Sequence, residues 1–477
     1  MSQLRQQTLK GLLWSGVERL SSNFVQFVVT LVMARMLTPH DYGVVGMLAV
    51  FIAVSQSLVD SGFSQALIRK QDRTDVDNST VFYFNIVIGV LIYLILFVCA
   101  PLIAKFYEEP ILTDITRVLS LTVIINSLAV VQRALLSADV DFKTQAKVTL
   151  TAALLSGAVG ITMAATGFGV WAIVGQQMTI VVMSTVMLWT LAHWHPIWAY
   201  SWKSFREMFG FGSKLMLSGL LNTLYNNIYL LIIGKVFSAN DLGHYTRAHQ
   251  FSEFPSQNLN NIITRVSYPV LCKIDDDMQL AAAYRKLIRM SGFIMFPMML
   301  GLAAVAKPLV LVLLTEKWQF ASTLLTIICF SMMWYPVHSL NLNLLQVKGR
   351  SDLFLKLEII KKLIGVGILC ATVPFGLIAM CCGSILTSLI CLVVNTYYTG
   401  KLINVGFLRQ MRDLMPSLLL SLAMGAVVYA TCYFLPLGDI WKLIIGTSIG
   451  IVFYIAGAKL LRLSEWQETI SIIKQHQ

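Results

Sequence analysis

The stretch Val81–Ala104, VFYFNIVIGVLIYLILFVCAPLIA, has 24 residues and no charged side chain. A helix needs about 20 mostly apolar residues to cross the hydrocarbon core of a bilayer. Similar runs recur from one end of the chain to the other, and Leu414–Leu435 is another of full length. Asp, Glu, Lys and Arg make up 13% of the residues, against about 25% in soluble domains. The sequence therefore predicts an all-α polytopic membrane protein.

This hydropathy pattern predicts 14 transmembrane helices joined by short loops. We place them at 11–34, 42–68, 80–104, 112–137, 148–166, 170–192, 208–234, 243–271, 290–314, 321–345, 357–374, 377–398, 414–435 and 440–461. The eighth, at 243–271, is so rich in His, Arg, Gln and Asn that hydropathy alone would miss it. Its assignment depends on an internal repeat.

The repeat divides the chain into two related halves. Residues 34–43, ARMLTPHDYG, align without a gap with residues 234–243, GKVFSANDLG, at an offset of 200. In both copies a basic residue ends one span and an Asp-x-Gly motif leads into the next. The polar segment 243–271 then corresponds to the apolar second span, so we expect it to cross the membrane as well. The chain should form two pseudo-symmetric six-helix lobes followed by two C-terminal helices.

The domain boundaries follow from this repeat. We predict an N-lobe at 1–192, a cytoplasmic interfacial linker at 193–207, a C-lobe at 208–398, and the last two spans with a cytoplasmic tail at 399–477. In the linker, Trp194, Trp198 and Trp202 recur every four residues, which predicts an anchor helix at the membrane interface.

Loop charges set the orientation of these spans. With 14 spans, most Lys and Arg residues of the loops fall on the side of both termini, and without the eighth span they would not. The positive-inside rule makes that side cytoplasmic. The net charge of +12 is spread over many short loops, so membrane orientation explains it better than binding to nucleic acid.

Charged residues inside the predicted spans are the first functional candidates, because each costs at least about 2.5 kcal/mol near the bilayer centre. They are the bases Arg19, Arg133, Lys214, Arg247 and Arg265 and the acids Glu18, Asp60 and Glu253. Such residues normally face protein or a water-filled cavity. Arg133, Lys214 and Arg265 are also near enough to span ends to reach the interface, and the adjacent Glu18 and Arg19 could form an internal ion pair.

Polar side chains recur every three or four residues on two of the spans. The seventh carries Lys214, Ser218, Asn222, Tyr225, Asn226 and Tyr229, and the eighth carries Gln250, Glu253, Gln257, Asn260, Asn261 and Thr264. This spacing places each set on one helix face. Hydrogen bonding between helices is one explanation, but it needs only one or two polar residues. Amides and phenols suit sugar hydroxyls, and Arg and Lys suit phosphate oxygens.

Several motifs resemble the Wzx-type polysaccharide flippases, in the colanic-acid-exporter-like branch of the multidrug/oligosaccharidyl-lipid/polysaccharide exporter superfamily. They are Asn260-Asn261-Ile262-Ile263-Thr264-Arg265-Val266 with Pro269 and Lys273–Asp277, Ala34-Arg35 with Asp41-x-Gly43, Ser61-Gly62-Phe63, and Glu316-Lys317-Trp318. The resemblance covers essentially the whole chain. It implies a cationic lumen between two lobes and a location in the bacterial inner membrane.

On this resemblance, the protein would be a flippase and not an enzyme. It would move undecaprenyl-pyrophosphate-linked oligosaccharides across the membrane by alternating access, for exopolysaccharide or lipopolysaccharide biosynthesis, next to a polysaccharide polymerase and export machinery. We expect the substrate lumen to include Arg133, Lys214, Asn222, Asn226, Tyr229, Arg247, Gln250, Gln257, Asn260, Asn261 and Arg265. Glu18, Asp60 and Glu253 are candidates for ion coupling, because protonation changes how a buried carboxylate interacts.

Other functions remain open on sequence alone. A peptidoglycan-precursor flippase or a drug/cation antiporter would share the fold, although a cationic drug would favour an acidic lumen. A membrane-embedded glycan polymerase or ligase would usually need a long extramembrane loop, and the predicted outward loops are short. No phosphate-binding glycine loop and no metal-binding motif occurs in the sequence, so we expect no cofactor and no metal.

Overall fold

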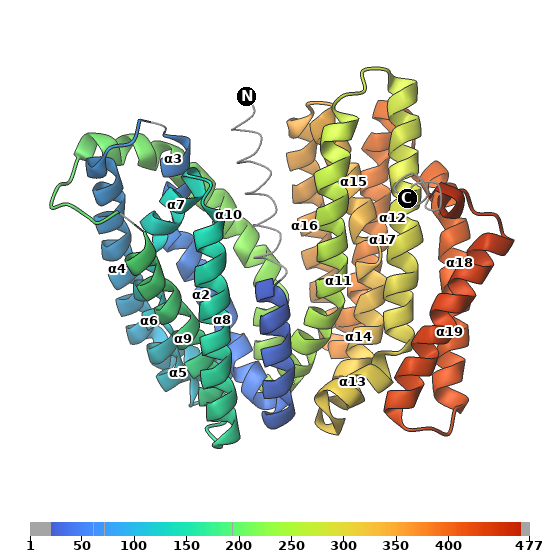
Figure 1. The fold of residues 1–477 in the computed structure, drawn as a ribbon, viewed down its shortest axis with the longest axis horizontal. Coiled ribbons are helices and arrows are strands. Elements are labelled where there is room, and N and C mark those ends of the chain that lie inside the picture. Colours follow the sequence, from blue (N-terminus) through green and yellow to red (C-terminus); the bar gives the residue numbers. More distant parts are fainter. Residues whose placement is uncertain (1–20, 61, 71, 193, 469–477) are drawn as a thin grey trace. The chain divides into compact units, whose positions relative to one another are not determined.

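The described part of the chain is built from helices (Figure 1). The computed structural model describes residues 21–468 except 61, 71 and 193, and within these residues it contains no β-strand. The helices divide into two compact units, Met1–Gly243 and His244–Gln477.

The first unit begins with a helix over residues 21–36. It continues with α2 (Pro39–Asp60), α3 (Phe63–Arg69), α4 (Asp75–Tyr107), α5 (Leu112–Leu119), α6 (Leu121–Ser127), α7 (Val130–Ala138), α8 (Phe142–Ala165), α9 (Val170–Leu191) and α10 (Trp202–Val236). The second unit holds most of α11 (Ala239–Leu271), then α12 (Asp277–Ala304), α13 (Ala306–Leu314), α14 (Gln319–Met332), α15 (Tyr335–Val347), α16 (Ser351–Thr372), α17 (Leu377–Ile403), α18 (Phe407–Phe434) and α19 (Asp439–Leu460). Two 3-10 turns, η1 (Glu316–Trp318) and η2 (Val373–Phe375), complete the second unit.

The predicted fold class is confirmed, because the described residues contain 10 helices that are long and apolar enough to cross a bilayer, or 11 with one bent pair. The predicted number of 14 is not confirmed. The first predicted span lies partly outside the described residues. The eighth and eleventh correspond to α11 and α16, which have 33 and 22 residues but are too polar or charged to meet the same criterion.

The repeated Asp-x-Gly motif has a structural reason. The backbone N–H of Thr38 donates to Asp41 Oδ2 at 2.8 Å, and in the second copy the backbone N–H of Asp241 donates to Ser238 Oγ at 3.1 Å. These contacts cap the starts of α2 and α11. The glycines allow the two starts to touch reciprocally. A Cβ on Gly43 would lie 1.6 Å from the carbonyl oxygen of Ala239, and one on Gly243 would lie 1.8 Å from that of Pro39.

The division into units differs from the division by repeat. Helix α10 packs against α2, α3 and α4, which places it in the first unit. The repeat instead groups its residues with the second half. The units are defined by packing contacts and the lobes by the sequence repeat. Because these criteria differ, the predicted lobe boundaries stay predictions.

The linker prediction is wrong in one respect, because residues 194–201 form no helix. Pro196 explains this, since proline removes a backbone donor and restricts the preceding residue to extended conformations. The segment is held instead by side chains of α4. The backbone N–H of Ile197 donates to Ser79 Oγ at 2.9 Å, and that of Ser201 donates to Thr80 Oγ1 at 3.0 Å.

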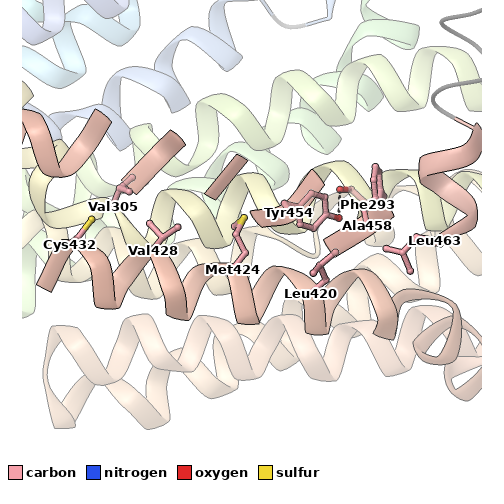
Figure 2. Packing of buried hydrophobic residues seen from close by; sticks show 9 residues of the cluster. All are labelled: Phe293, Val305, Leu420, Met424, Val428, Cys432, Tyr454, Ala458 and Leu463. Carbon is pink, nitrogen blue, oxygen red and sulfur yellow. Dashed lines mark hydrogen bonds between the residues drawn. The ribbon is translucent and has the colours of Figure 1, made fainter. Parts of the chain in front are cut away.

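The core of the second unit joins its last two helices to earlier ones. Figure 2 shows one cluster, in which Leu420, Met424 and Val428 of α18 pack near Tyr454 of α19, and the Tyr454 hydroxyl donates to the Phe293 carbonyl of α12 at 2.8 Å. Elsewhere, the buried amides of Asn341 and Gln410 exchange two hydrogen bonds of 3.0 Å each, linking α15 to α18. The C-terminal helix pair is therefore attached by both apolar and polar contacts.

Candidate functional site

A polar cavity of about 570 Å³ lies inside the first unit. It is formed by one face of α2, the start of α3, the region where α6 meets α7, and the middle of α10. Its lining residues are Ala53, Gln56, Ser57, Val59, Asp60, Ser64, Val123, Asn126, Val130, Arg133, Thr223, Asn226 and Asn227. Three of the predicted site residues, Asp60, Arg133 and Asn226, thus come together from three different helices.

A break in the fourth predicted span brings Arg133 to this cavity. The segments Leu112–Ser127 and Val130–Ala138 meet at an angle of 42°. Arg133 is the fourth residue after the break, and its Nη2 donates to Asn126 Oδ1 at 3.2 Å across it. Because a guanidinium has five donors, this bond leaves it capable of binding further acceptors in the cavity.

The cavity places one base and one acid among neutral hydrogen-bonding groups. Asp60 accepts a hydrogen bond from the hydroxyl of Ser64, one turn further along the chain. The amides of Gln56, Asn126 and Asn226 supply both donors and acceptors. This combination can hold an anionic group at Arg133 and hydroxyl-rich groups at the amides. The described residues contain no group of His, Cys, Asp and Glu arranged to hold a metal ion.

The remaining predicted residues of the first unit are not in the cavity lining. Lys214 and Asn222 are exposed on α10, and Tyr229 is half-buried further along that helix. Glu18, the third coupling candidate, lies outside the described residues. Only part of the predicted α10 face therefore contributes to the cavity.

In the second unit, the polar face of α11 is bonded largely along its own helix. Glu253 accepts from Gln257 Nε2 one turn away and lies 3.3 Å from Nδ1 of His249 one turn before. Arg247 donates through Nη1 to Gln250 Oε1. Among the predicted lumen residues of this helix, Asn260 is buried, whereas Gln257, Asn261 and Arg265 are exposed. The face predicted from the spacing is therefore not uniform, because its residues differ in exposure and several bond to neighbours on their own helix.

In the second half, a histidine is the fourth residue after an interrupted helix, as Arg133 is in the first half. The tenth predicted span also breaks, between α14 and α15, and His338 is the fourth residue of α15. Its Nε2 lies 3.0 Å from Ser388 Oγ, and its Nδ1 lies 3.1 Å from Nδ2 of Asn395. Both ring nitrogens therefore lie within hydrogen-bonding distance of a polar side chain of α17.

Several lining residues were not predicted from the sequence. Gln56 and Ser57 share the cavity face of α2 with Asp60, and Ser64 of α3, Asn126 of α6 and Asn227 of α10 also line the cavity. The repeat could have indicated these residues. Its offset of 200 pairs Gln56, Ser57, Asp60 and Ser64 with Ser256, Gln257, Asn260 and Thr264 of the polar α11 face. Polar residues on both copies of one helix mark that face in both halves.

Fold and site together define a multi-pass membrane protein with a polar cavity inside its first unit. The fold resembles a solved structure of the lipid II flippase MurJ, in an inward closed conformation, with a TM-score of 0.76 and 14% sequence identity over 96% of this chain and 100% of that one. At this identity the likeness concerns the fold alone.

Sequence comparison identifies the family. A family described as "polysaccharide biosynthesis protein" matches residues 32–323, and the chain belongs to it. The teichuronic acid biosynthesis protein TuaB of Bacillus subtilis is 25% identical over 437 residues, 90% of each chain. The lipopolysaccharide biosynthesis protein WzxC of Escherichia coli K12 is 26% identical over 400 residues, 82% of this chain and 80% of that one. The resemblance to Wzx-type flippases is thereby confirmed.

Proposed function

We propose that this protein transports lipid-linked oligosaccharides, carried on a polyprenyl diphosphate, across the bacterial inner membrane for the assembly of a cell-surface polysaccharide. The observation that carries this proposal is the helix-lined cavity in which Arg133 stands among amides and hydroxyls. Diphosphate oxygens are bound well by guanidinium groups, and sugar hydroxyls by amides. Membership of a polysaccharide biosynthesis family supports this class of substrate.

The substrate's two ends would meet different surroundings. The diphosphate and sugars cannot enter hydrocarbon unaided, because unsatisfied polar groups and charges are costly there. Arg133, Lys214, Arg247 and Arg265 would keep their path positive, while the prenyl chain stays in lipid. The two halves would open the path alternately to each side, as in other transporters built from repeats.

Orientation, coupling and partners belong to the same proposal. The excess of loop Lys and Arg supports cytoplasmic termini, with transport toward the outer leaflet. Asp60 and Glu253 are the described carboxylates that could couple transport to a proton or sodium gradient, with Glu18 as a third. A polysaccharide polymerase and export machinery would receive the translocated units.

A reconstituted assay tests this function directly. The full chain is placed in liposomes with an undecaprenyl-diphosphate-linked oligosaccharide, and a non-permeant glycosidase reports how much sugar reaches each face. We expect protein-dependent movement that rises with an imposed ion gradient. Parallel samples contain lipid II or a cationic dye. Movement of lipid II or the dye, with none of the oligosaccharide lipid, would replace this proposal by one of the two alternative transporter functions.

A further inference from the structure

The segment 194–203 is hydrogen-bonded to α4 in the first unit. Its backbone is held by Ser79 and Thr80 of α4, and Trp194 Nε1 donates to Asp75 Oδ1 at 3.1 Å. Despite this fixation, Trp198 is 96% exposed and Trp202 is 65% exposed. Large aromatic side chains on a backbone that is already held in place lose little further conformational entropy when they bind a ligand.

These tryptophans continue an apolar surface of α4. The ring of Trp198 stacks on Tyr83 with centroids 5.7 Å apart and an angle of 24° between the planes. Beyond Tyr83, the exposed apolar residues of α4 recur at helical spacing: Val87, Leu91, Leu94, Val98 and Leu102. A long exposed stripe of this composition on a spanning helix faces lipid. Trp198 therefore lies at the end of a lipid-facing stripe, the level at which tryptophan is enriched in membrane proteins.

Two cations adjoin the tryptophans. Lys203 and Arg206 lie in the first turns of α10, and both are exposed. Neither forms an ion pair among the described residues, since the nearby carboxylate of Glu207 is engaged 3.2 Å from Lys70 Nζ. Trp202 and Arg206 are one turn apart and share a helix face with Lys203.

We propose that Trp198, Trp202, Lys203 and Arg206 form a binding site for the headgroup of an anionic phospholipid. The tryptophan rings would lie among the headgroups and upper acyl chains, with the two cations on the phosphate and on the lipid's net negative charge. Cations near an anionic membrane surface and aromatic rings at the interface both favour this occupant over a zwitterionic lipid. The site is separate from the cavity around Arg133 and does not depend on the transported substrate.

Native mass spectrometry of the detergent-purified full chain tests the site. The protein is titrated with phosphatidylglycerol, with phosphatidylcholine and with undecaprenyl phosphate. We expect phosphatidylglycerol to bind more tightly than phosphatidylcholine. The double variant Lys203→Gln/Arg206→Gln should bind phosphatidylglycerol roughly tenfold to thirtyfold more weakly. A control that removes the same charge, Lys147→Gln/Lys459→Gln, should bind it like the wild type, because both lysines are exposed and no tryptophan adjoins them in sequence.

A second measurement addresses the tryptophans. Brominated phosphatidylglycerol should quench tryptophan fluorescence less in Trp198→Phe than in the wild type. Unchanged phosphatidylglycerol binding in the Lys203/Arg206 double variant, or equal quenching in both proteins, would overturn the proposal. If the double variant lost only undecaprenyl phosphate binding, the site would belong to the carrier lipid instead, and this inference would be wrong.

Discussion

The fourth predicted span of each half is interrupted, with a 42° bend in the first half, and the fourth residue after the interruption differs in its surroundings. In the first half, Arg133 lines an open polar cavity and bonds across the break to Asn126. In the second half, His338 is enclosed between Ser388 and Asn395, and both ring nitrogens have partners. A charged side chain thus borders a cavity in one half, while a histidine is incorporated into a packed core in the other.

This difference shows that an interrupted spanning helix can either present a polar side chain to a cavity or hydrogen-bond that side chain to other parts of the protein. The α11 face behaves like His338, because Glu253 is bonded to neighbours one turn away on its own helix. The α2 face behaves like Arg133, because it shares its cavity with α7 and α10. If the comparison holds, substitutions of Arg133 should impair transport, and substitutions of His338 should chiefly impair stability.

The two halves are most alike where α2 and α11 begin, and breaking that contact should have the largest effect. In Gly43→Ala the new Cβ would overlap the Ala239 carbonyl, and in Gly243→Ala that of Pro39. Because backbone atoms cannot yield as side chains do, each change should cost more than about 3 kcal/mol. Thermal unfolding in detergent measures this loss. Gly210→Ala, with open space around its Cβ position, is the control. Full stability of either variant would contradict the reciprocal contact.

The next largest effect is expected at His338. His338→Ala removes one hydrogen-bond partner of Ser388 and one of Asn395 and leaves a void, which should destabilise the protein by about 2–4 kcal/mol. The molecules that remain folded should transport normally. Removing the exposed His195 should change stability by less than about 0.5 kcal/mol. A stable His338→Ala protein without transport would place His338 in the substrate path and remove the contrast with Arg133.

Arg133 should show the opposite pattern. Arg133→Gln keeps a polar side chain in the cavity but removes the charge that would bind phosphate. Transport in the reconstituted assay should fall about 10- to 100-fold, since a hydrogen bond to a charged group contributes about 1.5–3 kcal/mol. Thermal stability should stay unchanged. Arg412→Gln removes an exposed charge on α18 and should transport like the wild type; a comparable loss there would indicate a general charge effect.

The smallest expected effect is a difference in gradient dependence between variants of the two candidate coupling carboxylates, Asp60 and Glu253. Glu253→Gln keeps hydrogen-bonding capacity towards His249 and Gln257, so gradient dependence should change less than about threefold. Asp60→Asn, in the cavity, should weaken the dependence further, because the amide can neither take up nor release a proton. Transport measured across a range of imposed gradients compares them. A larger loss in Glu253→Gln would assign coupling to the second half.

The internal repeat predicted the positions of α2 and α11, whereas the features that depend on tertiary packing could not be predicted from the sequence. The offset of 200 correctly indicated helices at Pro39–Asp60 and Ala239–Leu271, because the same capping and glycine chemistry starts both. It could not indicate the break before Val130, where Ser127-Leu128-Ala129 contains neither proline nor glycine. That break brings Arg133 to Asp60. The regular tryptophan spacing suggested a helix in the linker, but Pro196 and the hydroxyls of Ser79 and Thr80 favour an extended chain.

The paired amides of Asn341 and Gln410 limit how this chain can be shortened. Asn341 also accepts from Thr399 Oγ1 at 2.7 Å, so one buried asparagine serves three helices. A protein ending after α17 would retain the helices of both repeats, but it would leave part of this asparagine's hydrogen-bonding capacity unused in an apolar interior. The two terminal helices are thus an integral part of the second unit, and a version without α18 and α19 would need an apolar residue at position 341.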